Sequence, residues 1–144
     1  YLRKLNMQLS SKMRFVSAQL VALLENDLWR RNAEHANGMA QRLRSAVEAG
    51  IADGSVRGVE FTQPTQANGV FAVLPAGVAD RLRESFRFYD WGPADGGSED
   101  RASDASSVGG EDEARREVRW MCSFDTSASD VDAFVAELAR LTTD

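Results

Sequence analysis

Gly69-Val70-Phe71-Ala72-Val73-Leu74 is a continuous apolar run that Pro75 closes. A short run of this kind between turn-forming residues is typical of a strand that is covered on both faces. Pro75 lacks the backbone N–H that a strand ladder needs, so we expect the strand to end there. The run predicts a strand inside a small sheet, and the segments on either side of it predict what surrounds that strand.

Two further segments have the composition of strands. Residues 56–61 are short and rich in β-forming side chains, and Pro64 follows them. Residues 85–91 carry four aromatic side chains, two of which should face opposite to the other two. The first pair is Phe86 and Phe88, and the second is Tyr89 and Trp91.

Residues 117–124 predict a fourth strand with two different faces, because successive strand residues point to opposite sides. The apolar face holds Val118, Trp120 and Cys122, and the other holds Arg119, Met121 and Ser123. Arg119 is the candidate binding residue of this strand, since an arginine fork grips a carboxylate through two parallel hydrogen bonds. The alternative is an arginine that is simply solvated on a strand. Cys122 is expected to be a buried, unreactive thiol.

The remaining segments show the three- and four-residue spacing of helices. Ser10-Ser11 is placed to cap a first helix, Asn26-Asp27 to bend or break it, and Gly50 to cap a second helix that reaches residue 49. Shorter helices are predicted at residues 78–84 and after residues 126–129. The first helix should bury one stripe, made of Met13, Val16, Leu20, Leu23, Leu24 and Leu28.

Residues 92–115 differ from the rest of the chain in composition. The net charge of the protein is −5, and residues 92–113 hold seven acidic residues against one arginine, so the remainder is nearly neutral. Apart from one valine this segment offers no aliphatic side chain, and it cannot bury enough apolar surface to offset its ordering entropy. We expect a disordered acidic insertion between two strands.

The order of elements predicts an α+β domain. Residues 1–50 form a helical segment that docks on a body of protein outside the chain, and residues 51–144 form a small, mostly antiparallel sheet covered by helices. With one cysteine and one histidine, the sequence offers no disulfide and no multi-cysteine or multi-histidine metal site. The single histidine, His35, has no neighbour that would orient it as a base.

Charge and hydropathy limit where the protein acts and what it binds. No apolar run approaches the roughly 20 residues of a membrane span, and the arginines alternate with acids, so we expect neither membrane nor nucleic-acid partners. A cytoplasmic location is the expectation. The N-terminal Tyr1-Leu2-Arg3-Lys4 suggests a chain cut from a longer one.

An ordered set of short motifs resembles low-specificity threonine aldolases. The set covers nearly the whole chain outside the insertion, and no single motif in it is specific alone. Its N-terminal half comprises Arg3-Lys4, Gln8 to Phe15, Asp27-Leu28-Trp29, Asn32-Ala33, His35-Ala36-Asn37 and Met39-Ala40. Its C-terminal half comprises Ala67 to Phe71, Leu74-Pro75, Phe88 to Trp91, Val118-Arg119, Ser123 to Thr126, Asp130-Val131-Asp132 and Phe134.

The resemblance implies the C-terminal small domain of a fold-type-I enzyme that uses pyridoxal 5'-phosphate. The implied reaction is retro-aldol cleavage of L-threonine or L-allo-threonine to glycine and acetaldehyde. In this family the lysine that forms the Schiff base, its aspartate and a stacking histidine lie upstream of the position that matches Tyr1. We therefore expect the isolated chain to be inactive and to act with an N-terminal large domain, or with a split-gene partner, in a homo-oligomer.

The resemblance also implies roles for individual residues. Arg119 matches the arginine that holds the substrate carboxylate, and Arg14, with Lys12, is a candidate contact for the cofactor phosphate at the start of a helix, where backbone N–H groups favour anions. Lys4 is a further candidate for the cofactor. Three alternatives stay open: another fold-type-I lyase such as a β-eliminating lyase, an aminotransferase, and an interaction module without catalysis.

Overall fold

The computed structural model describes residues 1–6, 12–91 and 115–143, the side chains of Arg3 and Lys4 excepted. The predicted Ser10-Ser11 cap and almost all of the acidic insertion lie outside these residues. Arg115, assigned to the insertion from its composition, is instead the first residue of a strand. Apart from a short helix at Leu2–Leu5 that was not predicted as a separate element, the observed elements follow the predicted order of helices and strands.

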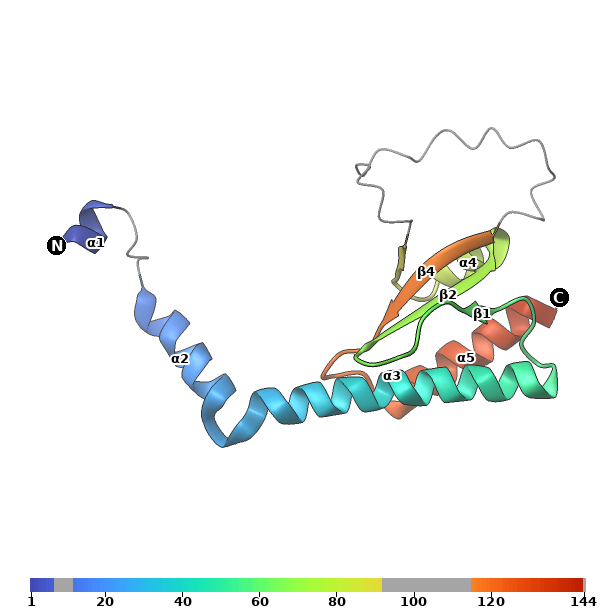
Figure 1. Ribbon diagram of the computed structural model, residues 1–144, viewed down its shortest axis with the longest axis horizontal. Coiled ribbons are helices and arrows are strands. Elements are labelled where there is room, and N and C mark those ends of the chain that lie inside the picture. Colours follow the sequence, from blue (N-terminus) through green and yellow to red (C-terminus); the bar gives the residue numbers. More distant parts are fainter. Residues whose placement is uncertain (7–11, 92–114, 144) are drawn as a thin grey trace.

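The N-terminal third is helical and bent. It consists of α1 (Leu2–Leu5), α2 (Met13–Leu24), the 3-10 turn η1 (Glu25–Asp27) and α3 (Leu28–Asp53). Asn26 and Asp27 have φ angles of 53° and 58°, in the left-handed region that asparagine and aspartate tolerate better than most residues. This is the predicted break, and Figure 1 shows α2 leaving the N-terminal end of α3 at an angle.

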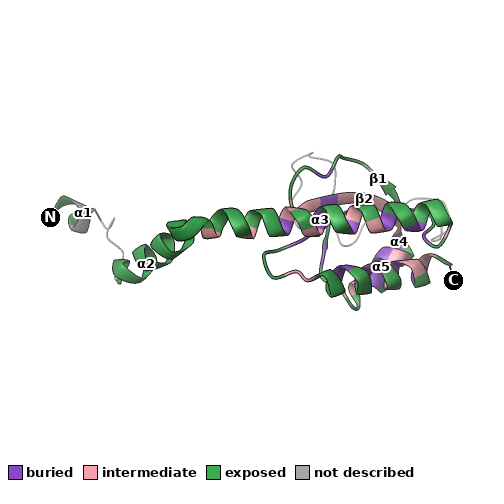
Figure 2. Ribbon diagram, turned by 90° about the horizontal axis from the view of Figure 1, so that it is seen from below, coloured by how far each residue is buried: buried purple, intermediate pink, exposed green. Residues whose placement is uncertain are grey.

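No residue of α2 is buried. The apolar stripe predicted for the first helix is present but exposed, with Leu20 56% and Leu24 65% accessible, and Figure 2 shows α2 exposed throughout. No other described element covers this stripe. Its burial was expected on a body of protein outside the chain, so that expectation stays a prediction. Among the described helices, none combines the length and the apolar character that a bilayer span requires.

The sheet has four antiparallel strands in the order β1-β2-β4-β3. Their bounds are β1 Glu60–Phe61, β2 Gly69–Pro75, β3 Tyr89–Asp90 and β4 Arg115–Met121. The segments 56–61 and 85–91 contribute only two paired residues each. Their buried apolar residues Val56, Val59 and Phe88 lie in loops beside these short strands. The mostly antiparallel α+β fold is confirmed.

Helices α3, α4 (Ala76–Arg83) and α5 (Ala128–Thr143) lie on one face of the sheet. Leu43, Leu82 and Leu138 from these helices meet Val70 and Val118 of the strands in one buried cluster. The side chains of β2 alternate between buried and half-buried along the strand. The prediction that residues 69–74 are covered on both faces is wrong within the described residues, because only one face has helices on it.

The end of α3 differs from the prediction at Gly50. The helix continues to Asp53, and Gly54, with φ 82°, is its C-terminal cap. Gly50 is a buried position inside the helix, where an added Cβ would lie 2.7 Å from Cγ2 of Val56. Glycine is needed there for close packing and not for a turn.

Replacing Gly50 with alanine should lower the free energy of unfolding by up to about 2 kcal/mol. Overpacking of a core costs roughly 1–3 kcal/mol, and the higher helix propensity of alanine returns about 1 kcal/mol. Gly38→Ala is the matched control, because it lies in the same helix with open space around its Cα. That variant should be more stable than the original by about 0.5–1 kcal/mol. Urea unfolding measures both, and equal signs for the two substitutions would contradict this packing.

Candidate functional site

The side chains of the sheet that point away from the helices define what we call the open face: Tyr89, Arg119, Phe71, Trp91, Glu117 and Met121. Strand register places them there. Arg119 of β4 is opposite Phe71 of β2 on one side and opposite Tyr89 of β3 on the other. The alternation predicted for residues 117–124 is therefore observed, with Val118, Trp120 and Cys122 buried on the helical side.

One aromatic ring lies against the guanidinium of Arg119, and a second ring packs on the first. Its Cζ lies 4.7 Å from the ring centroid of Trp91, within the range of a cation–π contact. The Trp91 ring meets Phe71 edge to face, with centroids 5.2 Å apart. The backbone N–H of Trp91 donates to the carbonyl of Glu117 at 2.8 Å, which extends the pairing of β3 with β4 by one residue. Arg119 is thus held against a platform that belongs to the sheet itself.

Arg119 differs from its neighbours on β4 in having no acidic partner in the part of the chain that the structure describes. Arg115 pairs with Glu60 at 2.7 Å, and Arg116 with Asp80 at 2.6 Å. The Nε of Arg119 is buried and has no hydrogen-bond partner among the described residues. Its two Nη groups are not among the buried atoms, and they too have no partner in the described residues. They present two parallel donors, which fit an anion with two oxygens such as a carboxylate.

The structure does not bring the other predicted site residues to the open face. Lys12 and Arg14 lie at the start of α2, which extends from the N-terminal end of α3 away from the sheet (Figure 1). Both are exposed, and the Arg14 guanidinium stacks on its neighbour Phe15 with Cζ 4.8 Å from the ring centroid. The side chain of Lys4 lies outside the described residues.

The described residues alone do not form a site for pyridoxal phosphate. The sequence has only two lysines, Lys4 and Lys12, and neither lines either of the two described cavities. The positively charged group on the open face is the Arg119 guanidinium, and no lysine lies beside it. Within the described ranges, no cluster of three or more His, Cys, Asp or Glu side chains is arranged to hold a metal.

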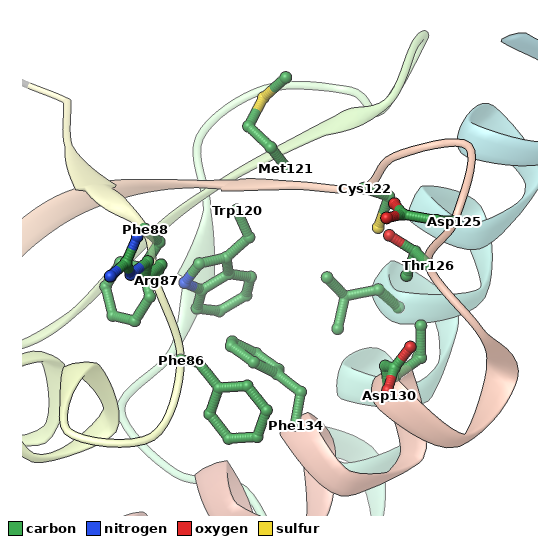
Figure 3. Close-up of a pocket in the computed structure, with 12 residues that line it drawn as sticks. Phe86, Arg87, Phe88, Trp120, Met121, Cys122, Asp125, Thr126, Asp130 and Phe134 are labelled. Atoms are coloured by element: carbon green, nitrogen blue, oxygen red, sulfur yellow. The ribbon is translucent and has the colours of Figure 1, made fainter.

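A separate cavity of about 290 Å³ opens on the helical side, between the end of β4, the start of α5 and the segment before β3 (Figure 3). Trp120 and Phe134 form part of its wall, with ring centroids 5.0 Å apart. Cys122 also lines it, and burial raises the pKa of this thiol. A raised pKa leaves less thiolate at neutral pH, which agrees with the predicted unreactive role.

His35 joins two parts of the fold. Its Nε2 lies 2.8 Å from the carbonyl oxygen of Thr126, in the turn between β4 and α5. The contact ties the middle of α3 to that turn, so the role of His35 is structural. The sequence had offered no neighbour that would orient His35 as a base, and it favoured a packing or surface role.

Fold and site together define an α+β domain with a ring-supported guanidinium on the open face of its sheet, and this group has no acidic partner among residues 1–6, 12–91 and 115–143. The chain is homologous to the C-terminal portion of low-specificity L-threonine aldolases. It is 36% identical over 132 residues to the enzyme of that name from a Pseudomonas species, and 37% identical over 134 residues to the one from Pseudomonas aeruginosa. These matches cover 91% and 92% of the chain, and the chain spans 30% of the length of each relative.

A solved structure shows the same fold. The threonine aldolase of Leishmania major superimposes with a TM-score of 0.60 and 21% identity, over 84% of this chain and 28% of that one. No family model matches the sequence. The resemblance found from the motifs is therefore confirmed by relatives whose alignments cover most of this chain.

Cys122 should react with a disulfide reagent such as Ellman's reagent at least roughly tenfold more slowly in the folded protein than in urea at pH 7.5. The thiol is 4% exposed, and its raised pKa lowers the thiolate fraction. Because it is the only cysteine, one absorbance trace reports one site. Equal rates in the folded and unfolded protein would show that the thiol is accessible and its environment is not as described.

Proposed function

We propose that this chain is the carboxylate-binding domain of a low-specificity threonine aldolase, which cleaves L-threonine or L-allo-threonine to glycine and acetaldehyde. The observation that supports the proposal most directly is the Arg119 guanidinium, buried at Nε and without an acidic partner among the described residues. The relatives at 36–37% identity supply the reaction. The remaining part of the enzyme, about 70% of the length of those relatives, would hold the cofactor and its lysine.

The proposed task of Arg119 is to bind and orient the amino acid. Its planar fork donates two parallel hydrogen bonds to the two carboxylate oxygens, and this fixes both the position and the rotation of the substrate. Orientation of the bond to be broken is a large part of catalysis by an enzyme of this kind, since the cofactor carries the electronic chemistry. Arg119 stays protonated throughout, so it transfers no proton.

The exposed stripe of α2 is the surface through which we propose that the domain joins the rest of the enzyme. Leu20 and Leu24 are each more than half exposed, and Val16 of the same stripe is 46% exposed. A row of apolar side chains on one side of a helix is typical of a surface that packs on another body. The part of the relatives that the chain does not span is the natural occupant, and the assembled enzyme is proposed to be a homo-oligomer. Arg14 and Lys12 stay candidates for the cofactor phosphate in that assembly.

Arg119→Lys in the complete enzyme should raise KM for L-threonine at least roughly tenfold while the cofactor stays bound. Lysine keeps the charge but loses the two-pronged geometry, and a hydrogen bond to a charged group contributes about 1.5–3 kcal/mol. Arg116→Lys is the matched control on the same strand, because Arg116 pairs with Asp80 on the helical side. Steady-state kinetics with L-threonine, L-allo-threonine and phenylserine, together with cofactor absorbance, measure the effect.

An unchanged KM for all three substrates in Arg119→Lys would remove the carboxylate role from this residue. Strong turnover of a substrate with a leaving group on Cβ, in place of aldol cleavage, would support a β-eliminating lyase instead.

Leu20→Glu should weaken the association of the chain with the rest of the enzyme by at least roughly tenfold, since it places a charge in the apolar stripe. Ala22→Glu adds the same charge to the opposite side of α2 and should have little effect. The measurement is co-purification of the chain with the complementary part, followed by cofactor absorbance and glycine release. The chain alone should release no glycine. Equal association of both variants would show that the stripe does not form the contact.

A further inference from the structure

Trp91 is held by two contacts and touches Arg119 by a third. Its backbone N–H donates to the Glu117 carbonyl at 2.8 Å, its ring packs edge to face with Phe71, and the Arg119 guanidinium lies over its ring face. It is the only residue with a cation–π contact to Arg119 in the described part of the chain. The ring is therefore anchored to the sheet on one side and to the cation on the other.

Arg119 needs such support because little else in the described residues holds its head group. An arginine side chain has many rotamers, and ordering it costs up to about 2 kcal/mol. Arg115 and Arg116 are ordered by ion pairs, and Arg119 has none among the described residues. A carboxylate site functions only when its donors are held within about 10–20° of the binding geometry. The flat face of Trp91 supplies a plane on which the guanidinium lies before any ligand arrives.

The other aromatic residues of the open face do not share this role. Tyr89 is the direct cross-strand partner of Arg119, but its side chain is 72% exposed and the structure gives it no ring contact. Phe71, on the opposite side, meets the Trp91 ring, so it acts on the guanidinium only through Trp91.

We infer that Trp91 is a positioning residue, which pre-orients the Arg119 fork for the substrate carboxylate. The inference rests on the proposed function of Arg119 and adds a second residue to it. Trp91 needs no contact with the substrate. Its contribution is to lower the ordering cost of Arg119 on binding, an effect that belongs to substrate affinity and not to bond cleavage.

Trp91→Leu in the complete enzyme should raise KM for L-threonine about tenfold, which corresponds to about 1.4 kcal/mol, with kcat within about twofold of the original. Leucine keeps an apolar side chain against Phe71 but offers no ring face. Trp91→Phe restores a ring face and should keep KM within about threefold. Phe61→Leu is the matched control, because it removes the ring beneath another arginine, Arg44, whose Cζ lies 4.1 Å from the Phe61 centroid and which is not part of the open face.

The double variant Trp91→Leu/Arg119→Lys tests whether Trp91 acts through Arg119. In that background the tryptophan substitution should change KM by less than about twofold, because the fork it positions is gone. If Arg119→Lys raises KM and Trp91→Leu does not, the positioning role is wrong and the carboxylate role of Arg119 stands. Two other results would also overturn the positioning role. One is a fall in kcat in Trp91→Leu as large as the rise in KM. The other is a KM for Trp91→Phe as high as that of Trp91→Leu. An unchanged KM in Arg119→Lys overturns the proposed function together with this inference.

Discussion

Residues 69–75 of β2 and 115–121 of β4 pair antiparallel along their full length, with Phe71 opposite Arg119 and Val70 opposite Trp120. Because side chains alternate along a strand, this register decides which of them are covered by helices and which lie on the open face. A slip of one residue would carry Arg119 into the helical core and Trp120 into solvent. The buried charge and the exposed indole that result would both be costly, so the core and the candidate site enforce the same register.

The sequence predicted the parts of the fold that depend on short periods. Val118, Trp120 and Cys122 had to share a face, and Arg119 had to lie opposite them, as the structure confirms. The bend at Asn26-Asp27 was also predictable, because these residue types tolerate the left-handed backbone found there. The predictions that failed depend on contacts between elements that the local sequence does not reveal. Gly50 looked like a cap because a glycine often ends a helix, yet its reason is the approach of Val56, from a loop six residues later.

The same limit applies to the site. Arg119 was found from alternation together with the family resemblance, but Trp91 was not, because its contact with Arg119 spans 28 positions and follows from the antiparallel pairing of β3 with β4. A usable signal was present in the alternating aromatics of residues 85–91, whose outward members had to lie beside an outward residue of some neighbouring strand. Likewise, the stripe of α2 was recognised as apolar, but its burial depends on protein that the described residues do not include.

An open sheet face is a poor place to hold a small carboxylate by itself. An ion pair that water can reach contributes about 0–1 kcal/mol, whereas the same pair gains strength where water is excluded. On the proposed assembly, α2 fixes the domain to the remaining part of the enzyme, and a tight carboxylate site at Arg119 requires that this part also covers the open face. Closure would lower the local dielectric around Arg119 and strengthen its hold on the substrate only once both parts are present. The affinity for an amino acid would then be a property of the assembly. Neither part alone would bind the substrate tightly, because the water-excluded, charged site would form only where the two parts meet.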